Sequence, residues 1–172
     1  VNFGQVQSCG TNTQVSVPCI FSPLTREQGG DKTAEHQNLL DVLQRAGLAV
    51  VWIDNQSGCK GLCDRVPNAN TRDLKQPGLC DSGDCLDEVM LGEMERQLAA
   101  LPPERKQLGT VVVLHQMGNH GPAYFKRSPA AHKVFLPECA SNALQDCDRQ
   151  TVVNAYDNAI RYTDHFLAQT IA

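Results

Sequence analysis

Near the start of the chain, two threonines lie between two closely spaced cysteines, in the segment SCGTNTQVSVPC at residues 8–19. A hydroxyl becomes a useful nucleophile at a helix N-terminus or on a metal ion, because both stabilise its alkoxide. Thr13 lies where this turn is expected to enter a short helix. Thr13 is therefore either a helix N-cap, which is the commoner role, or a nucleophile, and Thr11 competes for both roles. No Gly-x-Ser-x-Gly motif is present, so a serine hydrolase of that class is not indicated.

Two histidines follow a predicted strand in the segment HQMGNHGPAY, residues 115–124. His120 comes after His115 in a loop where Gly-Pro imposes a sharp turn, so it can point into a cleft. A histidine in a loop is often only solvated, but a strand end makes a functional role equally reasonable. Lys60 lies between two cysteines beyond another predicted strand, where it can bind an anion or be a solvated surface charge. The other histidines show no partner in the sequence and are interpreted as structural: His36, His132 and His165.

The eight cysteines fall into four close couples along the chain. A zinc site requires two short-spaced couples that converge, and only the segment CKGLC approaches that spacing. Local disulfides are therefore favoured over a zinc site, and they predict an oxidising compartment outside the cytoplasm. The couples are Cys9 with Cys19, Cys59 with Cys63, Cys80 with Cys85, and Cys139 with Cys147.

Length and composition are those of one ordinary globular domain. The chain has 172 residues, of which 41% are hydrophobic and 20% are charged. The net charge of −4, without a long run of Lys or Arg, argues against nucleic acid as a partner. No apolar run approaches the ~18 residues of a membrane span, and the sequence shows neither a signal peptide nor an initiator Met.

The elements that must position these residues follow an α/β pattern. Two continuous apolar runs, at residues 48–53 and 108–116, predict strands of a parallel sheet that are buried on both faces. In such sheets ligands bind beyond the carboxyl ends of the strands, where the segments with Lys60 and His120 follow. Polar, cysteine-rich loops are predicted at residues 54–84 and 126–148.

Three amphipathic helices are predicted around these strands. The first covers residues 31–46, with Asp31 or Thr33 as its cap and Gly47 after its end. The second covers residues 86–101, and the third is a long helix at residues 149–172. The apolar stripe expected on this last helix consists of Val152, Tyr156, Ala159, Ile160, Thr163, Phe166 and Leu167.

Four segments of the sequence together closely resemble the lipid A phosphoethanolamine transferases, a family that includes the mobile colistin-resistance enzymes. In chain order they are SCGTNTQVSVPCIFS, WIDNQSGCKG, HQMGNHGPAYFKR and NAYDNAIRYTD. The first and third are highly specific, and the resemblance covers essentially all 172 residues. It implies an alkaline-phosphatase-like, sulfatase-type α/β fold, a parallel-sheet sandwich that is incomplete in this chain. It also implies a location at the periplasmic face of the bacterial inner membrane.

The resemblance assigns roles to three of the candidate residues. Thr13 matches the second threonine of the family's CGTxT motif, which is the covalent nucleophile and a ligand of Zn²⁺. Lys60 and His120 match the lysine and histidine on the substrate side of the site. The implied reaction moves phosphoethanolamine from phosphatidylethanolamine to lipid A, which confers polymyxin and colistin resistance. Three cysteine couples also match family pairs, whereas the couple in CKGLC varies between members.

Residues 1–172 are expected to form only part of the periplasmic catalytic domain, and to be inactive alone. The N-terminal membrane domain, the first catalytic strand with its glutamate ligand, and a later Asp-His metal motif are expected to lie outside the chain. The TDHF segment at residues 163–166 is not that motif. Two alternatives stay open: a non-catalytic, disulfide-stapled periplasmic binding module, or another phospho- or sulfo-transfer enzyme of the alkaline phosphatase superfamily. A sulfatase uses a modified Cys or Ser as nucleophile, so Thr13 argues against that activity.

Overall fold

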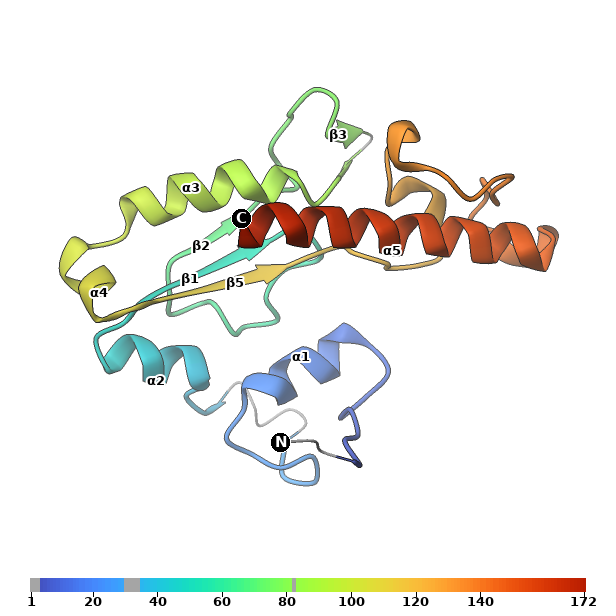
Figure 1. Ribbon diagram of the computed structural model, residues 1–172. Helices are drawn as coiled ribbons and strands as arrows, with labels where there is room; N and C mark the ends of the chain where they lie inside the picture. Colours follow the sequence, from blue (N-terminus) through green and yellow to red (C-terminus); the bar gives the residue numbers. More distant parts are fainter. Residues whose placement is uncertain (1–3, 30–34, 82) are drawn as a thin grey trace. The chain divides into compact units, whose positions relative to one another are not determined.

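The computed structural model describes residues 4–29, 35–81 and 83–172 and has an α/β architecture (Figure 1). Its contacts divide the chain into two compact units. Unit 1 comprises Val1–Ile53, Ser57–Ala69 and Gln97–Val113. Unit 2 comprises Asp54–Gln56, Asn70–Arg96 and Leu114–Ala172.

A three-stranded sheet has the order β2-β1-β5, formed by Asn68–Asn70, Ala49–Asp54 and Thr110–His115. The amide of Ala49 donates to the carbonyl of Gly109 at 3.0 Å, and that of Asn55 donates to His115 at 2.9 Å. Both partners advance in the same direction, so β1 and β5 are parallel, as the sequence predicts.

Burial differs between the two long strands of this sheet. All six residues of β1 are buried, as expected of a strand with a neighbour on each side. β5 is only half-buried along most of its length, so the prediction of a second fully buried strand is wrong. The reason is its position at the end of the strand order in the described part of the chain, which leaves one side of β5 without a hydrogen-bonded strand.

The core of unit 1 forms where two helices pack against β1. These are α1, Thr13–Phe21, and α2, Leu39–Arg45 (Figure 1). The Phe21 ring meets the Trp52 ring edge-on, with centroids 5.7 Å apart, a contact that contributes about 1 kcal/mol beyond its buried area. The buried members of this core are Leu40, Val50, Trp52, Cys59, Leu62, Cys63 and Val66.

Helix α2 begins later than its sequence predicts. The expected start at residue 31 and the proposed caps Asp31 and Thr33 lie outside the described residues, and residues 35–38 are not α-helical. Asn38 is the N-cap, and it forms a capping box with Asp41. Its side-chain amide also donates to the Leu62 carbonyl at 2.9 Å. This contact with a distant segment helps to fix the start of the helix. The apolar periodicity of the sequence cannot predict it.

An ion pair links α2 to the segment that follows β1. The Arg65 guanidinium donates to both oxygens of the buried Asp41 carboxylate, at 2.9 and 2.6 Å. These hydrogen bonds lower the pKa of Asp41 below its ordinary value near 3.8, although burial of the carboxylate acts to raise it. A lowered folded-state pKa contributes stability that is present above the ordinary value and is lost as the pH falls through the folded value.

We therefore expect Arg65→Met to lower the free energy of unfolding at pH 7 by about 1–2 kcal/mol, because Arg65 is half-exposed and its pair is partly screened. The difference from the unmodified chain should shrink toward zero as the pH falls below 3.8. Urea unfolding across pH 2.5 to 7 (roughly the range in which carboxyl groups titrate) measures this. Arg149→Gln, at an exposed arginine, is the control, and a pH-independent difference for Arg65→Met would contradict the assignment.

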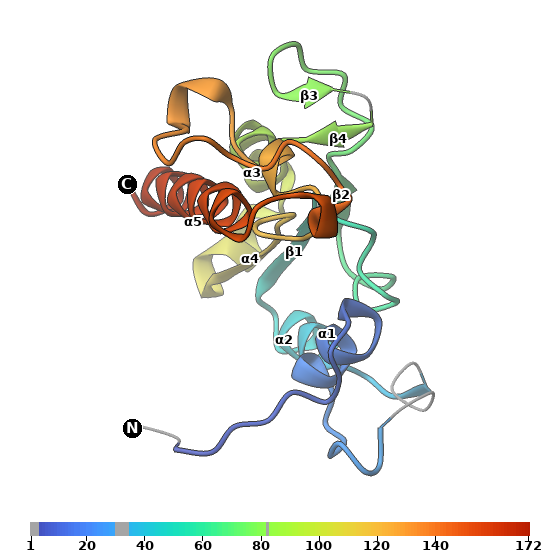
Figure 2. The same cartoon turned by 90° about the vertical axis from the view of Figure 1, so that its right-hand side faces the viewer.

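Unit 2 contains a long helix, the start of another helix, and a short hairpin. Helix α5 is Arg149–Ile171, α3 is Val89–Ala100, and the hairpin pairs β3, Cys80–Asp81, with β4, Asp84–Cys85 (Figure 2). The sequence predicts α5 and α3 but reads residues 54–84 as loop, because strands of two or three residues are too short to show periodicity. The short helix α4, Pro103–Leu108, is missed for the same reason. Single turns of 3₁₀ helix are Tyr124–Lys126, Ala130–His132 and Leu144–Asp146.

The buried side of α5 is more polar than its sequence pattern predicts. Asn158 is fully buried, and its amide oxygen accepts from the Val134 and Phe135 amides at 3.0 Å each. Its amide nitrogen donates to the Phe135 carbonyl and to Glu138, at 3.0 and 3.1 Å. The predicted stripe is therefore partly wrong, since three of its members are exposed: Tyr156, Ile160 and Leu167. The residues that are buried are Ala155, Asn158, Ala159, Tyr162 and Phe166.

Four disulfides close short loops within the structure. They join Cys9 to Cys19, Cys59 to Cys63, Cys80 to Cys85, and Cys139 to Cys147, so the eight cysteines leave no free thiol. Each of the four bonds joins residues of the same unit. Among the residues described, none of the helices has both the length and the apolar composition that crossing a bilayer requires.

Candidate functional site

Thr13 is the first residue of α1 and is half-buried. The N-cap is Asn12, whose side-chain oxygen accepts from the Val15 amide at 3.1 Å. The interpretation of Thr13 as the N-cap is therefore wrong, because Asn12 is at least as good a cap and precedes it. Thr13 instead lies in the first turn, at the positive end of the helix dipole, where an alkoxide is stabilised. Thr11 is exposed and lies before the helix.

Lys60 lies in the turn closed by the disulfide between Cys59 and Cys63. It is the only non-glycine residue with a positive φ, 56°, in the described part of the chain. Its ammonium donates to both the carbonyl and the hydroxyl of Ser57, at 2.6 Å each. This half-buried cation is thus held close to its own turn, and both it and Thr13 belong to unit 1.

His120 is exposed and belongs to unit 2. Its Nδ1 lies 2.8 Å from the Gly121 carbonyl oxygen, which can only accept a hydrogen bond. Nδ1 therefore carries the proton of the neutral ring, and Nε2 keeps a lone pair. The Arg127 guanidinium donates to the His120 carbonyl at 3.0 Å and holds the backbone of this loop.

A buried carboxylate anchors the loop that carries His120. Asp87 accepts from the amides of Met117 and Gly118, at 2.9 and 2.8 Å. It also accepts from the side-chain amide of Asn55 at 2.8 Å, which joins the loop to the end of β1. Asp87 is only 6% exposed, so these donors replace the water that a carboxylate needs.

The network continues through the ends of both parallel strands. The fully buried Asn55 side chain accepts from the Thr71 hydroxyl at 2.8 Å. Next to it, the Asp54 carboxylate lies 2.7 Å from Nδ1 of His115. The two histidines of the strand-end motif thus differ: the half-buried His115 pairs with the buried Asp54, whereas His120 is exposed to solvent. Sequence reasoning missed Asp87, Asn55 and Thr71, because their contacts join segments far apart in the chain.

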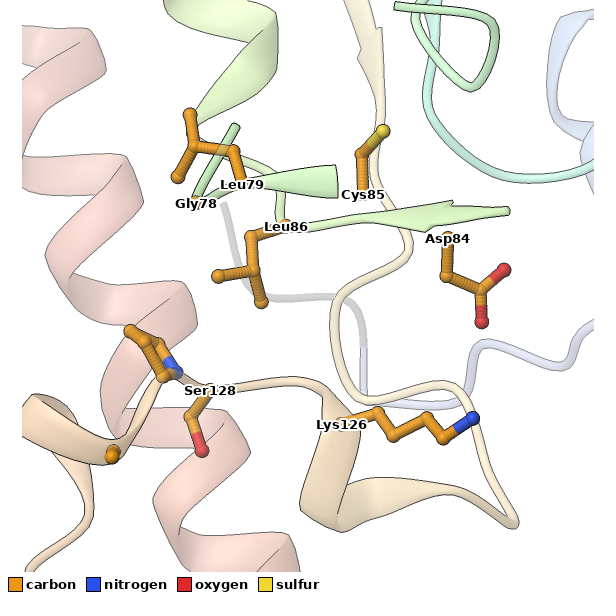
Figure 3. Close-up of a pocket in the computed structure, with 9 residues that line it drawn as sticks. Gly78, Leu79, Asp84, Cys85, Leu86, Lys126 and Ser128 are labelled. Atoms are coloured by element: carbon orange, nitrogen blue, oxygen red, sulfur yellow. The ribbon is translucent and has the colours of Figure 1, made fainter. Parts of the chain in front are cut away.

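A pocket of about 410 Å³ opens beside the β3–β4 hairpin in unit 2 (Figure 3). Its apolar wall comes from Leu79 and Leu86, and its charged side from Asp84 and Lys126. Ser128 also lines it, and its buried hydroxyl has no hydrogen-bond partner among the residues that the structure describes. A volume of this size and mixed polarity suits a small polar molecule.

The sequence shows no partner for His132 or His165, but the structure gives each of them one. The Nε2 atom of His165 lies 2.9 Å from a carboxylate oxygen of Glu88. The His132 ring lies against the His165 ring, with centroids 4.4 Å apart. No local signal could reveal this cluster, because its members are 33 or more residues apart in the sequence.

A sequence profile of the sulfatase family matches residues 1–172. The chain belongs to the sulfatase family. Within this family, phosphoethanolamine transferase EptA of Escherichia coli K12 is 44% identical over 99% of this chain. Phosphatidylethanolamine transferase Mcr-1 of Escherichia coli is 42% identical over 99% of it. The chain spans about a third of the length of these relatives, 30% and 32% respectively.

Comparison with solved structures leads to the same fold. The soluble domain of lipooligosaccharide phosphoethanolamine transferase A from Neisseria meningitidis matches with a TM-score of 0.89 and 42% identity. The match covers 99% of this chain and 50% of that one. A protein of the alkaline phosphatase superfamily from Vibrio parahaemolyticus, 16% identical with a TM-score of 0.55, shares the fold. The resemblance to phosphoethanolamine transferases and the alkaline-phosphatase-like α/β fold, both expected from the sequence, are thereby confirmed.

Proposed function

We propose that this chain is part of the periplasmic catalytic domain of an enzyme that transfers phosphoethanolamine from phosphatidylethanolamine to lipid A. The observation that carries the proposal is the match to named transferases, at 42–44% identity, over nearly the whole chain. The position of Thr13 supports it, because a disulfide encloses this hydroxyl at a helix N-terminus where a neighbour already performs the capping. The enzyme would act at the periplasmic face of the inner membrane and confer polymyxin and colistin resistance.

The proposed reaction has two displacements at phosphorus. In the first, Oγ of Thr13 forms a bond to the phosphorus of phosphatidylethanolamine, and the bond to the diacylglycerol oxygen breaks. The proton of the threonine hydroxyl is released, and the diacylglycerol oxygen takes up a proton. In the second, a phosphate oxygen of lipid A forms a bond to the same phosphorus, and the bond from phosphorus to Oγ of Thr13 breaks. The threonine oxygen takes up a proton, which restores the hydroxyl.

The other two candidate residues have binding roles in this proposal. Lys60 offers an ammonium to the anionic phosphoryl oxygens, for which it would leave its contacts with Ser57. His120 offers Nε2, which accepts a proton or a hydrogen bond from the substrate. Both assignments rest on the family motif.

Zinc, which the family implies, does not fit the described residues around Thr13. A structural or catalytic zinc takes at least three protein ligands, and a single hydroxyl does not retain it. In the described part of the chain, two groups of His, Cys, Asp or Glu side chains bring three ligand atoms close together. One of them, Cys59, Cys63 and Asp64, has its sulfurs in a disulfide and offers no thiolate. We propose that the ligands needed at Thr13 lie outside this chain, and no step above depends on the metal.

Trapping the covalent intermediate tests the proposal. The full-length protein, purified from membranes and incubated with headgroup-labelled phosphatidylethanolamine, should carry the label on the peptide that contains Thr13. Phosphatidylglycerol, which lacks the ethanolamine headgroup, is the control donor and should leave no phosphoethanolamine on the protein. Label on a different residue would overturn the role of Thr13, and transfer to lipid A without any labelled protein would overturn the two-step route.

A further inference from the structure

Three side chains with metal-binding chemistry converge in unit 2. Glu88 precedes α3, His132 ends the 3₁₀ turn Ala130–His132, and His165 lies on α5. One ligand atom from each, a carboxylate oxygen and two imidazole nitrogens, lies within 4.8 Å of the others. All three residues are half-buried, so they are partly shielded from water and still reachable by an ion.

The three side chains offer the ligand types found at transition-metal sites. The centroids of the His132 and His165 rings lie 4.4 Å apart. Neutral imidazole nitrogens and a carboxylate oxygen are ligands of zinc and of similar divalent transition metals. The side-chain nitrogen of Gln169, on the same helix as His165, lies 2.6 Å from Nε2 of His165.

The Tyr162 ring lies against both histidine rings of the cluster. It is 2% exposed, and its ring lies 5.1 Å from that of His132 and 5.9 Å from that of His165. In the described chain its hydroxyl has no partner at hydrogen-bonding geometry. A phenol hydroxyl can donate a hydrogen bond. Phenol donors of this kind orient carboxylate ligands of metal sites.

We propose that Glu88, His132 and His165 bind one divalent transition-metal ion, with zinc as the best match to two imidazoles and a carboxylate. A tetrahedral zinc holds its ligand atoms about 3.3 Å apart, so binding would draw together ligand atoms that now lie within 4.8 Å of one another. Three protein ligands leave a fourth position for water. The site uses none of the residues assigned to transfer, so it is independent of the proposed function.

The proposed ion would connect two segments that line the pocket of Figure 3. Leu86 lines that pocket and is two residues from Glu88, and Ala130 lines it at the start of the turn that contains His132. Metal binding should therefore reduce the mobility of both segments. Slower amide hydrogen exchange at residues 83–88 and 126–132 would report this directly.

Calorimetric titration of the oxidised chain with Zn²⁺, together with visible absorption of the Co²⁺ form, tests the proposal. We expect one equivalent of zinc, and an absorption spectrum of low-coordinate cobalt. Glu88→Gln, His132→Phe and His165→Phe should each weaken binding by about 100-fold or more, and Tyr162→Phe by about 10-fold. Phenylalanine preserves the ring packing, and Glu88→Gln preserves the side-chain volume, so at least one variant should fold as the unmodified chain does.

Two control variants make the result decisive. Thr13→Ala and His36→Phe remove a hydroxyl and an imidazole in unit 1, and both should bind zinc as the unmodified chain does. Zinc should raise the thermal midpoint of the unmodified chain and of both controls, but not that of the three ligand variants. The proposal is overturned if the unmodified chain binds no zinc at micromolar concentrations. It is equally overturned if binding persists in the ligand variants or is lost in Thr13→Ala alone.

Discussion

Thr13→Ala in the full-length protein is expected to lower phosphoethanolamine transfer to lipid A by on the order of 10⁴-fold, because it removes the atom that carries the intermediate in the proposed reaction. The protein should still fold, since Asn12 and not Thr13 caps α1 and since alanine is a good helix former. Mass spectrometry of lipid A after reaction with the purified enzyme measures the loss.

Thr11→Ala is the matched control, because it removes an exposed threonine hydroxyl two residues earlier in the same disulfide loop. It should retain measurable transfer. Thr13→Ser keeps a hydroxyl at the same place and should recover part of the activity. Equal residual activity in Thr13→Ala and Thr11→Ala would refute the assignment of the nucleophile.

Asp87→Ala is expected to lower the free energy of unfolding by about 3–5 kcal/mol. The substitution removes a buried carboxylate and leaves three buried or half-buried donors without their acceptor: the amides of Met117 and Gly118 and the side chain of Asn55. Urea unfolding followed by far-UV circular dichroism measures the change. Hydrogen exchange at Met117 and Gly118 should also become faster, since their amides lose protection.

Asp73→Ala provides the control for Asp87, because Asp73 is an exposed aspartate in the same unit. It should change stability by less than about 0.5 kcal/mol. The loss of stability in Asp87→Asn should be intermediate between those of Asp87→Ala and Asp73→Ala. An amide nitrogen replaces one carboxylate oxygen and cannot accept a hydrogen bond. If Asp87→Ala unfolds at the same urea concentration as Asp73→Ala, Asp87 does not anchor the His120 loop.

Some parts of this fold are predictable from the sequence because their cause is local. The apolar run of β1 is buried along its whole length, and the long periodic segment at the end of the chain forms α5. The family motifs lead to the correct family, and the short spacing of the cysteines leads to disulfides between sequence neighbours. In each case every segment that carries the signal is continuous in the sequence.

The remaining features depend on contacts between segments that are distant in the sequence. Such contacts do not show in its hydrophobic periodicity. Asn38 starts α2 partly through its bond to Leu62. Asn158 and Tyr162 are buried on a helix face that hydrophobicity alone assigns to other residues. The partner of His165 is Glu88, on a different element of unit 2. Polar side chains of this kind are buried because specific partners satisfy them, and a single sequence does not name the partners.

The spacing of side chains along helix α5 sets the positions of the loops that contact it. Asn158 holds the backbone of Val134 and Phe135, and the Thr163 hydroxyl donates to Asn119 at 3.1 Å. Each helical residue turns the chain by about 100° and advances it by about 1.5 Å. One inserted or deleted residue between Asn158 and Thr163 would therefore swing every later side chain a quarter turn or more from its partner. Length changes among homologues should consequently be absent from this interval and accumulate in the exposed loops, which have no such register to keep.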